Sequence, residues 1–266
     1  MFFRNEKNAV TYETSGLLTY PHVFSTRLGG VSTLPYLASM NIGENRGDSP
    51  ENVYKNFNIL LSLIGSSREN AVAGAQIHSV NIRFVTNEDR GGFFENTDGF
   101  ITNLPGIALV VKIADCMPLL MEDPVAGVIA AVHAGWRGSV NNIAGIGVEK
   151  MVSFGARPER IRVAAGSSIK KCCYEVGTDF YETVVSLRGK DFASAYISPD
   201  GEKYSCDLVG INTDALLAAG VKRENMDFSP FCTCCEPDIY HSHRATRGVR
   251  GTMGAAIMIN DYNSER

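Results

Sequence analysis

The hydrophobic pattern of the chain is most informative within residues 107–138, where two apolar runs flank the four-residue segment 123–126, Asp-Pro-Val-Ala. Two apolar runs joined by a short turn predict a β-hairpin. If the residues on either side of the turn pair directly, Cys116 lies opposite His133. Opposed residues have Cβ atoms about 4.5–5.5 Å apart, so the pattern predicts a thiol and an imidazole on one face. A bulge at Pro118 would shift this register by one residue.

The remaining elements follow from the same reading of periodicity, in which alternation predicts strands and three- and four-residue spacing predicts helices. Strands are expected at residues 9–12, 23–25, 75–85, 97–103 and 161–165 and in an apolar stretch ending near Ile259. Helices are expected at residues 50–64, 140–152, 176–187 and 207–219, with Ser49 and Asp207 as N-caps. Mixed strands and helices predict the α/β class with at least one antiparallel hairpin.

Composition narrows the class of protein without changing the fold prediction. The 266 residues are 44% hydrophobic and 20% charged, and no segment resembles a linker, which favours one domain over residues 1–266. The net charge is −4, and the 25 Lys and Arg residues are scattered, so no nucleic-acid partner is expected. The N-terminus lacks a signal-like apolar core, and no stretch approaches the roughly 20 apolar residues of a membrane span. A cytoplasmic protein without membrane partners is therefore expected.

The cysteines point to reduced thiols. Their number, seven, is odd, and Cys172 and Cys173 are sequence neighbours that could bridge each other only with strain. A disulfide framework is the alternative, and it is disfavoured in a chain of this length without a secretion signal.

Three polar segments could bind an anion or a ligand. Arg27 lies in a glycine-containing loop, where it could hold an anion or simply belong to a surface turn. Arg137 precedes a predicted helix, and its charge with the free N–H groups there could bind phosphate or carboxylate. In the alternative interpretation, Ser139 caps that helix and Trp136 packs beneath it. Ser167 lies in a tight loop after a predicted buried strand, where α/β folds often present backbone donors.

The Cys116–His133 pair supports three interpretations. With a third ligand the pair would bind zinc and leave one tetrahedral position open for water, which gives a catalytic site. Alternatively, His133 would deprotonate Cys116 for nucleophilic attack, as in cysteine hydrolases. In the third interpretation both side chains are packed in the core, since free cysteine is among the most buried residue types.

A family resemblance separates these interpretations. Three motifs resemble the hallmarks of the YfiH family, also called the multicopper polyphenol oxidase or laccase-domain family: Gln76-Ile77-His78, Ala114-Asp115-Cys116-Met117-Pro118 and His133-Ala134-Gly135-Trp136-Arg137-Gly138. Further segments follow the family's order: Phe24-Ser25-Thr26-Arg27, Gly29-Gly30-Val31-Ser32, Asn41-Ile42-Gly43, Gly47-Asp48-Ser49-Pro50, Cys172-Cys173-Tyr174-Glu175-Val176-Gly177 and Cys232-Thr233. The resemblance covers most of the chain.

The resemblance implies a single-domain α/β sandwich with mixed sheets, shared with a class of cysteine-hydrolase-like toxins. It also implies a purine nucleoside phosphorylase, which cleaves adenosine, inosine and methylthioadenosine with phosphate and also deaminates adenosine. The zinc ion would be held by His78, Cys116 and His133. By residue type alone, a lone histidine such as His78 near a strand end would usually be structural.

Substrate contacts are less well defined by the resemblance than the metal ligands are. Candidate contacts to phosphate or ribose are Arg27, Asn41, Arg46, Arg137, Ser167 and Arg244, and candidate acid or base groups are Asp115 and Glu175. The chain departs from the family pattern at Gly166-Ser167 and at Tyr240-His241, and both positions bear on substrate preference.

Alternatives to this function remain open. The chain has five histidines, too few for a full multicopper set, although copper could occupy the zinc site and support polyphenol oxidation. A hydrolase with Cys116 as nucleophile and a non-catalytic nucleotide-sensing module are the other candidates. Four further residues could form a second metal site or a redox pair, or could include only unpaired thiols near the surface: Cys234, Cys235, His241 and His243.

Overall fold

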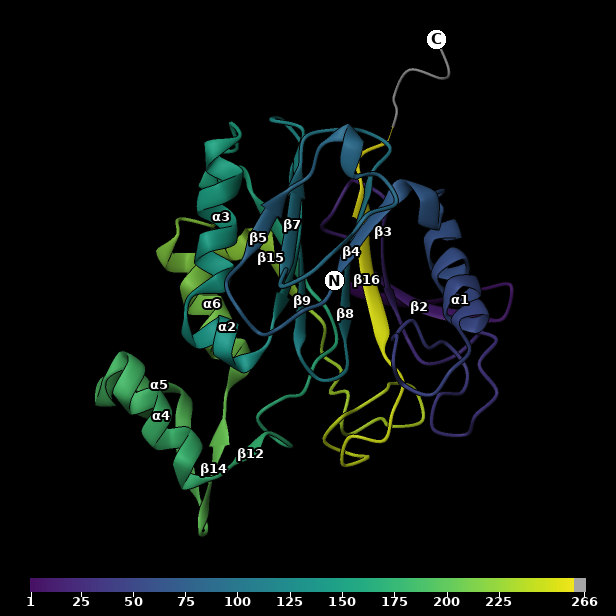
Figure 1. Cartoon of the computed structure of the whole chain (residues 1–266). Helices are drawn as coiled ribbons and strands as arrows, with labels where there is room; N and C mark the ends of the chain where they lie inside the picture. The colour runs from purple at the N-terminus through teal and green to yellow at the C-terminus, as the bar shows by residue number, and fades with distance from the viewer. Residues whose placement is uncertain (261–266) are drawn as a thin grey trace.

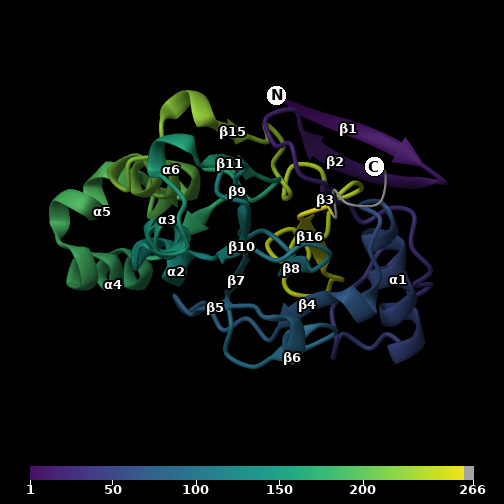
Figure 2. The same cartoon turned by 90° about the horizontal axis from the view of Figure 1, so that it is seen from above.

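Two large β-sheets pack face to face, and helices cover their outer faces (Figures 1 and 2). The computed structural model describes residues 1–260. The first sheet has the order β1-β2-β3-β16-β8-β4-β6 and the second β15-β11-β9-β10-β7-β5. Both sheets contain parallel and antiparallel neighbours, which confirms the predicted α/β sandwich with mixed sheets. The prediction of one domain over residues 1–266 stays a prediction, and residues 261–266 lie outside the described part.

The bounds of the elements are as follows. The first sheet contains β1 (Phe2–Lys7), β2 (Val10–Ser15), β3 (His22–Ser25), β4 (Ala71–Gly74), β6 (Phe93–Phe94), β8 (Ala108–Ile113) and β16 (Met253–Met258). The second contains β5 (Ile82–Phe84), β7 (Gly99–Thr102), β9 (Met117–Asp123), β10 (Val128–Ala134), β11 (Arg162–Ala165) and β15 (Met226–Phe228). A small third sheet contains β12 (Glu175–Val176), β13 (Ile197–Asp200) and β14 (Lys203–Cys206). The α-helices are α1 (Pro50–Ser62), α2 (Trp136–Val140), α3 (Ile143–Ser153), α4 (Thr178–Arg188), α5 (Lys190–Tyr196) and α6 (Leu208–Ala218).

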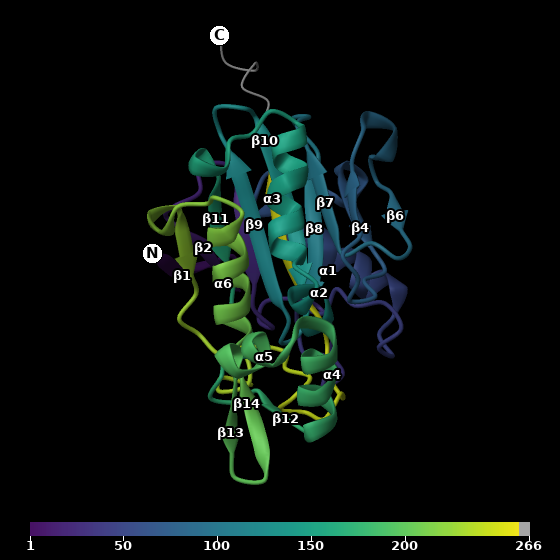
Figure 3. The ribbon, with the colours of Figure 1, turned by 90° about the vertical axis from the view of Figure 1, so that its left-hand side faces the viewer.

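The central strands are apolar on both faces because each face meets a different layer. In β9, Leu120 packs between the two sheets, whereas Leu119 and Met121 pack toward α3 and α6. In β8, Leu109 faces the second sheet and Val110 faces α1. The small third sheet lies with α4 and α5 at one end of the molecule, beyond α2 and α6 (Figure 3). Among residues 1–260, no helix is both long enough and apolar enough to cross a membrane.

Several predicted elements are confirmed, and two helices have the N-cap residues that the sequence predicted. α1 begins at Pro50, and the Ser49 side chain accepts the Asn52 N–H as an N-cap. α6 is capped in the same way by Asp207, which accepts the Gly210 N–H. The predicted strands at 9–12, 23–25, 97–103 and 161–165 correspond to β2, β3, β7 and β11.

The predicted hairpin forms, but the register predicted for it was wrong. β9 pairs with β10 through Asp123↔Val128 and Pro118↔His133, so Cys116 does not lie opposite His133. The turn is shifted by one residue because Gly127 adopts a φ of +67° and closes it, with its N–H donating to the Asp123 carbonyl. Pairing continues through Pro118, without the bulge considered above.

Two other strand predictions need correction. The apolar run before the turn is two strands, because the chain leaves the first sheet after Ile113 and enters the second at Met117, with Asp115 at a φ of +91° between them. The strand expected over residues 75–85 is present only at β5, because residues 75–81 form a loop in which His78 has a φ of +61°. The helix expected from residue 140 begins earlier, as α2, and restarts as α3.

Candidate metal centre

The His78 loop is held by one buried carboxylate. Asp98, which directly precedes β7, accepts the backbone N–H groups of Ile77, His78 and Ser79 at 3.2, 3.0 and 2.8 Å. The Ser79 hydroxyl donates to the same carboxylate at 2.7 Å. Gln76 ties the other side of the loop to β8 through two 2.7 Å hydrogen bonds with the Lys112 backbone. The loop therefore presents His78 in a fixed position despite its left-handed backbone.

The same carboxylate orients His133 at the end of β10. Nδ1 of His133 lies 2.8 Å from Oδ1 of Asp98, and the His133 backbone N–H donates to the Asp98 carbonyl at 2.7 Å. Burial opposes ionisation of Asp98, but hydrogen bonds from His133 and Ser79 lower its pKa to about 2. A carboxylate on Nδ1 leaves Nε2 of His133 as the ring nitrogen free to ligate, the arrangement that metal-binding histidines usually have.

Cys116 completes a three-residue group with the two histidines. One ligand atom each from His78, Cys116 and His133 lies within 4.8 Å of the others. The two imidazole rings are 4.9 Å apart between centroids and nearly perpendicular, at 82°. Burial opposes protonation of His133, but the Cys116 and Asp98 charges raise its pKa to about 9. The structure therefore brings the predicted pair together, although the bend at residues 114–116 does so and not a cross-strand register.

Two observations fit a bound metal ion. Nδ1 of His78 is buried and has no hydrogen-bond partner, and burial together with the nearby His133 lowers the His78 pKa to about 4. A neutral imidazole whose buried ring nitrogen has no hydrogen-bond partner can ligate a cation. A Cβ at Gly135 would lie 2.3 Å from that Nδ1 and 3.2 Å from Cys116 Sγ. Glycine is therefore required where the chain passes the ligands.

The side chains of His78, Cys116 and His133 line a cavity of about 850 Å³. Four cationic side chains line it: Arg46, Arg68, Lys112 and Arg250. Arg68 donates to the Ala71 and Gly91 carbonyls, and Lys112 is paired with Glu44 at 2.5 Å. Both of these cationic side chains are therefore already bound to other groups of the protein.

Arg46 is exposed, and Arg250 keeps donors for an anion, although its Nη1 already donates to the Gly251 carbonyl at 3.0 Å and to the Thr252 hydroxyl at 2.8 Å. Nε of Arg250 is buried without a hydrogen-bond partner, and burial together with the neighbouring Arg46 guanidinium lowers the Arg250 pKa to about 10. Two adjacent cations favour a multiply charged anion, although the charges of Asp115 and Cys116 partly offset that of Arg250.

Three predicted substrate contacts have structural partners instead. Arg27 donates to the carbonyls of Ala38, Pro237 and Pro35, and Ser167 donates to the Glu13 carboxylate at 2.7 Å. Asn41 is buried, and it accepts the N–H groups of Gly43 and Thr252. Asn41 thereby holds the loop that carries Arg46 against the cavity wall. None of these three residues lines the cavity.

Arg137, where an anion was expected, lies against an aromatic ring outside the cavity. The Arg137 guanidinium lies 4.4 Å from the centre of the Trp136 ring, which packs on Phe180 at 4.7 Å, and Arg137 does not line the cavity. Ser139 does not cap a helix; its hydroxyl accepts the Asn212 side-chain amide. The packing of Trp136 agrees with the alternative interpretation, whereas the capping does not.

The predicted acid and base groups also lie outside the cavity. Asp115 accepts the Thr233 hydroxyl at 2.7 Å and the Arg244 N–H at 2.6 Å, which stabilises the bend before Cys116. The Arg244 side chain donates to the Cys173 carbonyl. Glu175 is an exposed residue paired with Lys203 at 2.5 Å.

Two important residues were missed from the sequence. Asp98 lies 20 residues from His78 and 35 from His133. Its only signal in the sequence is that a polar residue directly precedes an apolar strand. Arg250 lies in a glycine-containing loop that has no regular pattern. The four residues considered for a second metal site, Cys234, Cys235, His241 and His243, are not brought together; Cys235 lies with Cys172, Cys173 and Cys232.

The chain is similar in sequence and in structure to known proteins. A family model described as multi-copper polyphenol oxidoreductase laccase matches residues 21–260. A Deinococcus radiodurans protein named purine nucleoside phosphorylase is 39% identical over 90% of this chain and 89% of its own length. A protein named adenosine deaminase RL5, from an unknown prokaryotic organism, is 32% identical over 83% and 87%. The crystal structure of YlmD from Geobacillus stearothermophilus matches with a TM-score of 0.85 and 31% identity, over 97% of this chain and 99% of that one.

Proposed function

The chain belongs to the multi-copper polyphenol oxidoreductase laccase family and is an enzyme, and we propose that it acts on purine nucleosides with zinc as its metal. The proposed reactions are phosphorolysis of adenosine, inosine and methylthioadenosine and deamination of adenosine. Two relatives are named for these two activities, which supports the substrate class.

The observation that carries the proposal is the incomplete ligand set at the cavity. His78, Cys116 and His133 supply three ligands, and structural zinc sites usually have four, whereas catalytic sites have three protein ligands and an open position. When bound, zinc would act as a Lewis acid and would lower the pKa of a bound water molecule to about 7. A cavity of about 850 Å³ is within the range of small-molecule sites and is large enough for a nucleoside.

The chain's own residues supply orientation and charge. Asp98 fixes the His133 ring and the His78 loop, so both ligands hold their positions without a bound substrate. Arg46 and Arg250 would hold phosphate beside the ligands, where it can attack the ribose carbon as the bond to the base breaks. Deamination needs water in place of phosphate, so one cavity can serve both reactions.

Arg250→Ala is expected to weaken phosphorolysis selectively. A hydrogen bond to a charged group contributes about 1.5–3 kcal/mol, so the KM for phosphate should rise about 10- to 150-fold. The rate of deamination in phosphate-free buffer should change much less, because that reaction uses no anion. Steady-state kinetics in both conditions measures the difference.

Arg137→Ala is the matched comparison for this variant, because it removes the arginine that the sequence placed at the anion site. Its KM for phosphate should stay near that of the wild type. A larger loss in Arg137→Ala than in Arg250→Ala would overturn the placement of the anion.

The activity itself is tested by incubating the protein with adenosine, with and without phosphate, and separating the products. Free adenine and ribose 1-phosphate in phosphate buffer, with inosine formed in its absence, is the expected result. Failure to convert adenosine, inosine or methylthioadenosine under either condition would remove the proposed function.

A second candidate function is a hydrolase with Cys116 as the nucleophile. It is favoured by the position of His133 between Cys116 and Asp98, because the raised His133 pKa promotes a thiolate–imidazolium pair. In that case iodoacetamide should alkylate Cys116 in the resting protein, and His78 should be dispensable for activity.

In the zinc account, the bound metal protects Cys116, and alkylation requires prior removal of the metal by a chelator. Mass spectrometry of the Cys116 peptide before and after chelation separates the two functions. Rapid alkylation of the fully metallated protein would support the hydrolase.

A further inference from the structure

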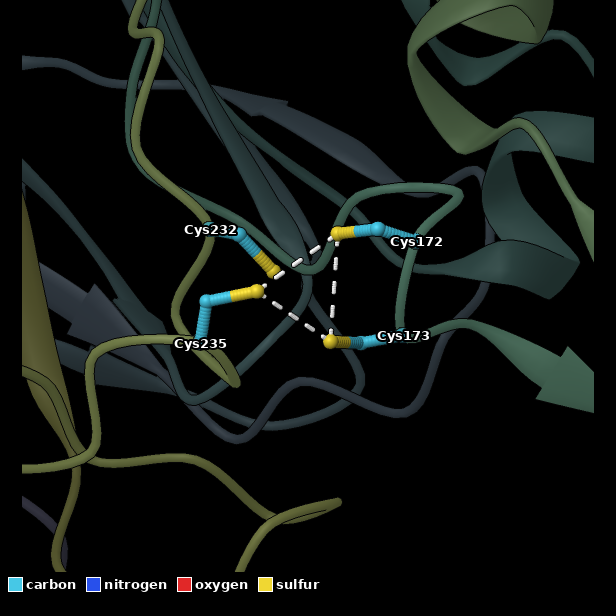
Figure 4. A group of neighbouring side chains, drawn as sticks. All are labelled: Cys172, Cys173, Cys232 and Cys235. Atoms are coloured by element: carbon cyan, nitrogen blue, oxygen red, sulfur yellow. Dashed lines mark hydrogen bonds between the residues drawn. The ribbon is translucent and has the colours of Figure 1, made fainter.

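Four thiols from two distant segments meet in one cluster (Figure 4), in which Cys172 and Cys235 are exposed and Cys232 is buried. Cys172 and Cys173 lie between β11 and β12, whereas Cys232 and Cys235 follow β15. All four sulfur atoms lie within 4.8 Å of one another. None of these cysteines lines the cavity that contains Cys116.

The sulfur spacing matches a single tetrahedral ion. With zinc–sulfur bonds of about 2.3 Å, the sulfurs of a regular tetrahedron lie about 3.8 Å apart. The Cys172 sulfur lies 3.8 Å from that of Cys173 and 3.6 Å from that of Cys235, and Cys173 and Cys235 are 3.3 Å apart. An iron–sulfur cluster would need wider spacing, because several irons and sulfides would lie between the ligands. We propose that Cys172, Cys173, Cys232 and Cys235 form a closed four-thiolate zinc site.

The surroundings of the cluster suit thiolates. Cys232 and Cys235 have the Cys-x-x-Cys spacing typical of one half of a zinc site. The Lys170 N–H donates to Cys232 Sγ at 3.4 Å. Binding Zn²⁺ releases four protons and leaves a complex with two net negative charges, which the nearby charge of Lys170 partly offsets. A single disulfide would use two sulfurs and leave the other two without a role.

The zinc site would join two loops that support the catalytic side of the molecule. Ser168 and Cys232 already form a parallel bridge, and the Thr233 N–H donates to the Ser168 carbonyl. Both loops also contact Asp115, through the Ile169 N–H to its carbonyl and the Thr233 hydroxyl to its carboxylate. The ion would therefore brace the bend that presents Cys116, without contacting the cavity.

Zinc stoichiometry of the full-length protein tests this proposal. Protein prepared under reducing conditions, stripped with a chelator and reloaded with Zn²⁺ should bind two equivalents. Cys235→Ser should bind one, and so should Cys172→Ser, which alters an exposed side chain. Cys234→Ser is the matched control, because it removes a thiol of the same segment that is outside the cluster, and it should keep both equivalents.

Loading with Co²⁺ gives a second readout, because thiolate-to-cobalt absorption increases with the number of sulfur ligands. Wild-type protein should show strong absorption that falls sharply in Cys235→Ser and only slightly in Cys116→Ser. One zinc equivalent in wild type, unchanged in Cys235→Ser, would overturn the proposal. A Cys173–Cys235 or Cys172–Cys235 disulfide in freshly isolated protein would overturn it as well. Loss of the second equivalent while adenosine turnover is absent in every protein would instead remove only the proposed function.

Discussion

His78→Ala is expected to lose one equivalent of bound zinc and more than about 100-fold of adenosine turnover. The variant leaves Cys116 and His133 as the only two protein ligands, short of the three that catalytic zinc sites normally have. Groups that merely orient a metal ligand already contribute about 10- to 100-fold, so loss of a ligand should exceed that range. Metal analysis and turnover are measured on the same preparation.

The fold should survive this substitution. Asp98 binds the His78 loop through backbone N–H groups, which alanine retains, and the His78 side chain donates no hydrogen bond through its buried Nδ1. His243→Ala provides a control of the same residue type at an exposed position outside both metal groups, and it should keep its full zinc content. Full zinc and full activity in His78→Ala would exclude His78 from the site and favour the hydrolase.

Asp98→Asn is expected to weaken zinc binding at the catalytic site by about 10- to 100-fold. The carboxylate accepts from His133 and from the His78 loop at once, so its neutralisation loosens two of the three ligands. An amide can also present N–H to Nδ1 of His133, which would favour the wrong tautomer for metal binding. Competition with a chelator of known affinity measures the change.

Asp48→Asn is a suitable control for general destabilisation. Asp48 also accepts several hydrogen bonds that organise a loop, from Ser32, Asn41 and Asn52, but it lies outside the metal ligands. Thermal unfolding of the two metal-free variants separates effects on folding from effects on zinc affinity. Equal zinc affinity in Asp98→Asn and wild type would show that the ligands do not depend on this carboxylate.

The hairpin shows what apolar periodicity can and cannot determine. The pattern correctly placed two strands around a short turn, because burial on both faces gives continuous apolar runs. It did not determine the bounds of the turn, which includes Gly127 and leaves Asp123 in β9. A shift of one turn residue moves every cross-strand pair by two positions.

The three proposed metal ligands were selected by motif resemblance, and the structure brings them together by means that geometry along the sequence did not predict. Cys116 reaches His133 because the chain bends at Asp115 between two sheets, and His78 reaches both through a loop with left-handed backbone. Neither feature leaves a periodic signal. Asp98 and Arg250 were missed for the same reason, since each acts through contacts made by loops distant in sequence.

The central claim, that zinc held by His78, Cys116 and His133 supports turnover of purine nucleosides, is tested most directly by metal restoration. Protein stripped of metal and shown to remain folded is mixed with adenosine while Zn²⁺ is added in fractions of an equivalent. The account predicts no turnover without metal, recovery as zinc fills this site, and no recovery in Cys116→Ala at any zinc level. Full turnover by the folded, metal-free protein would contradict it.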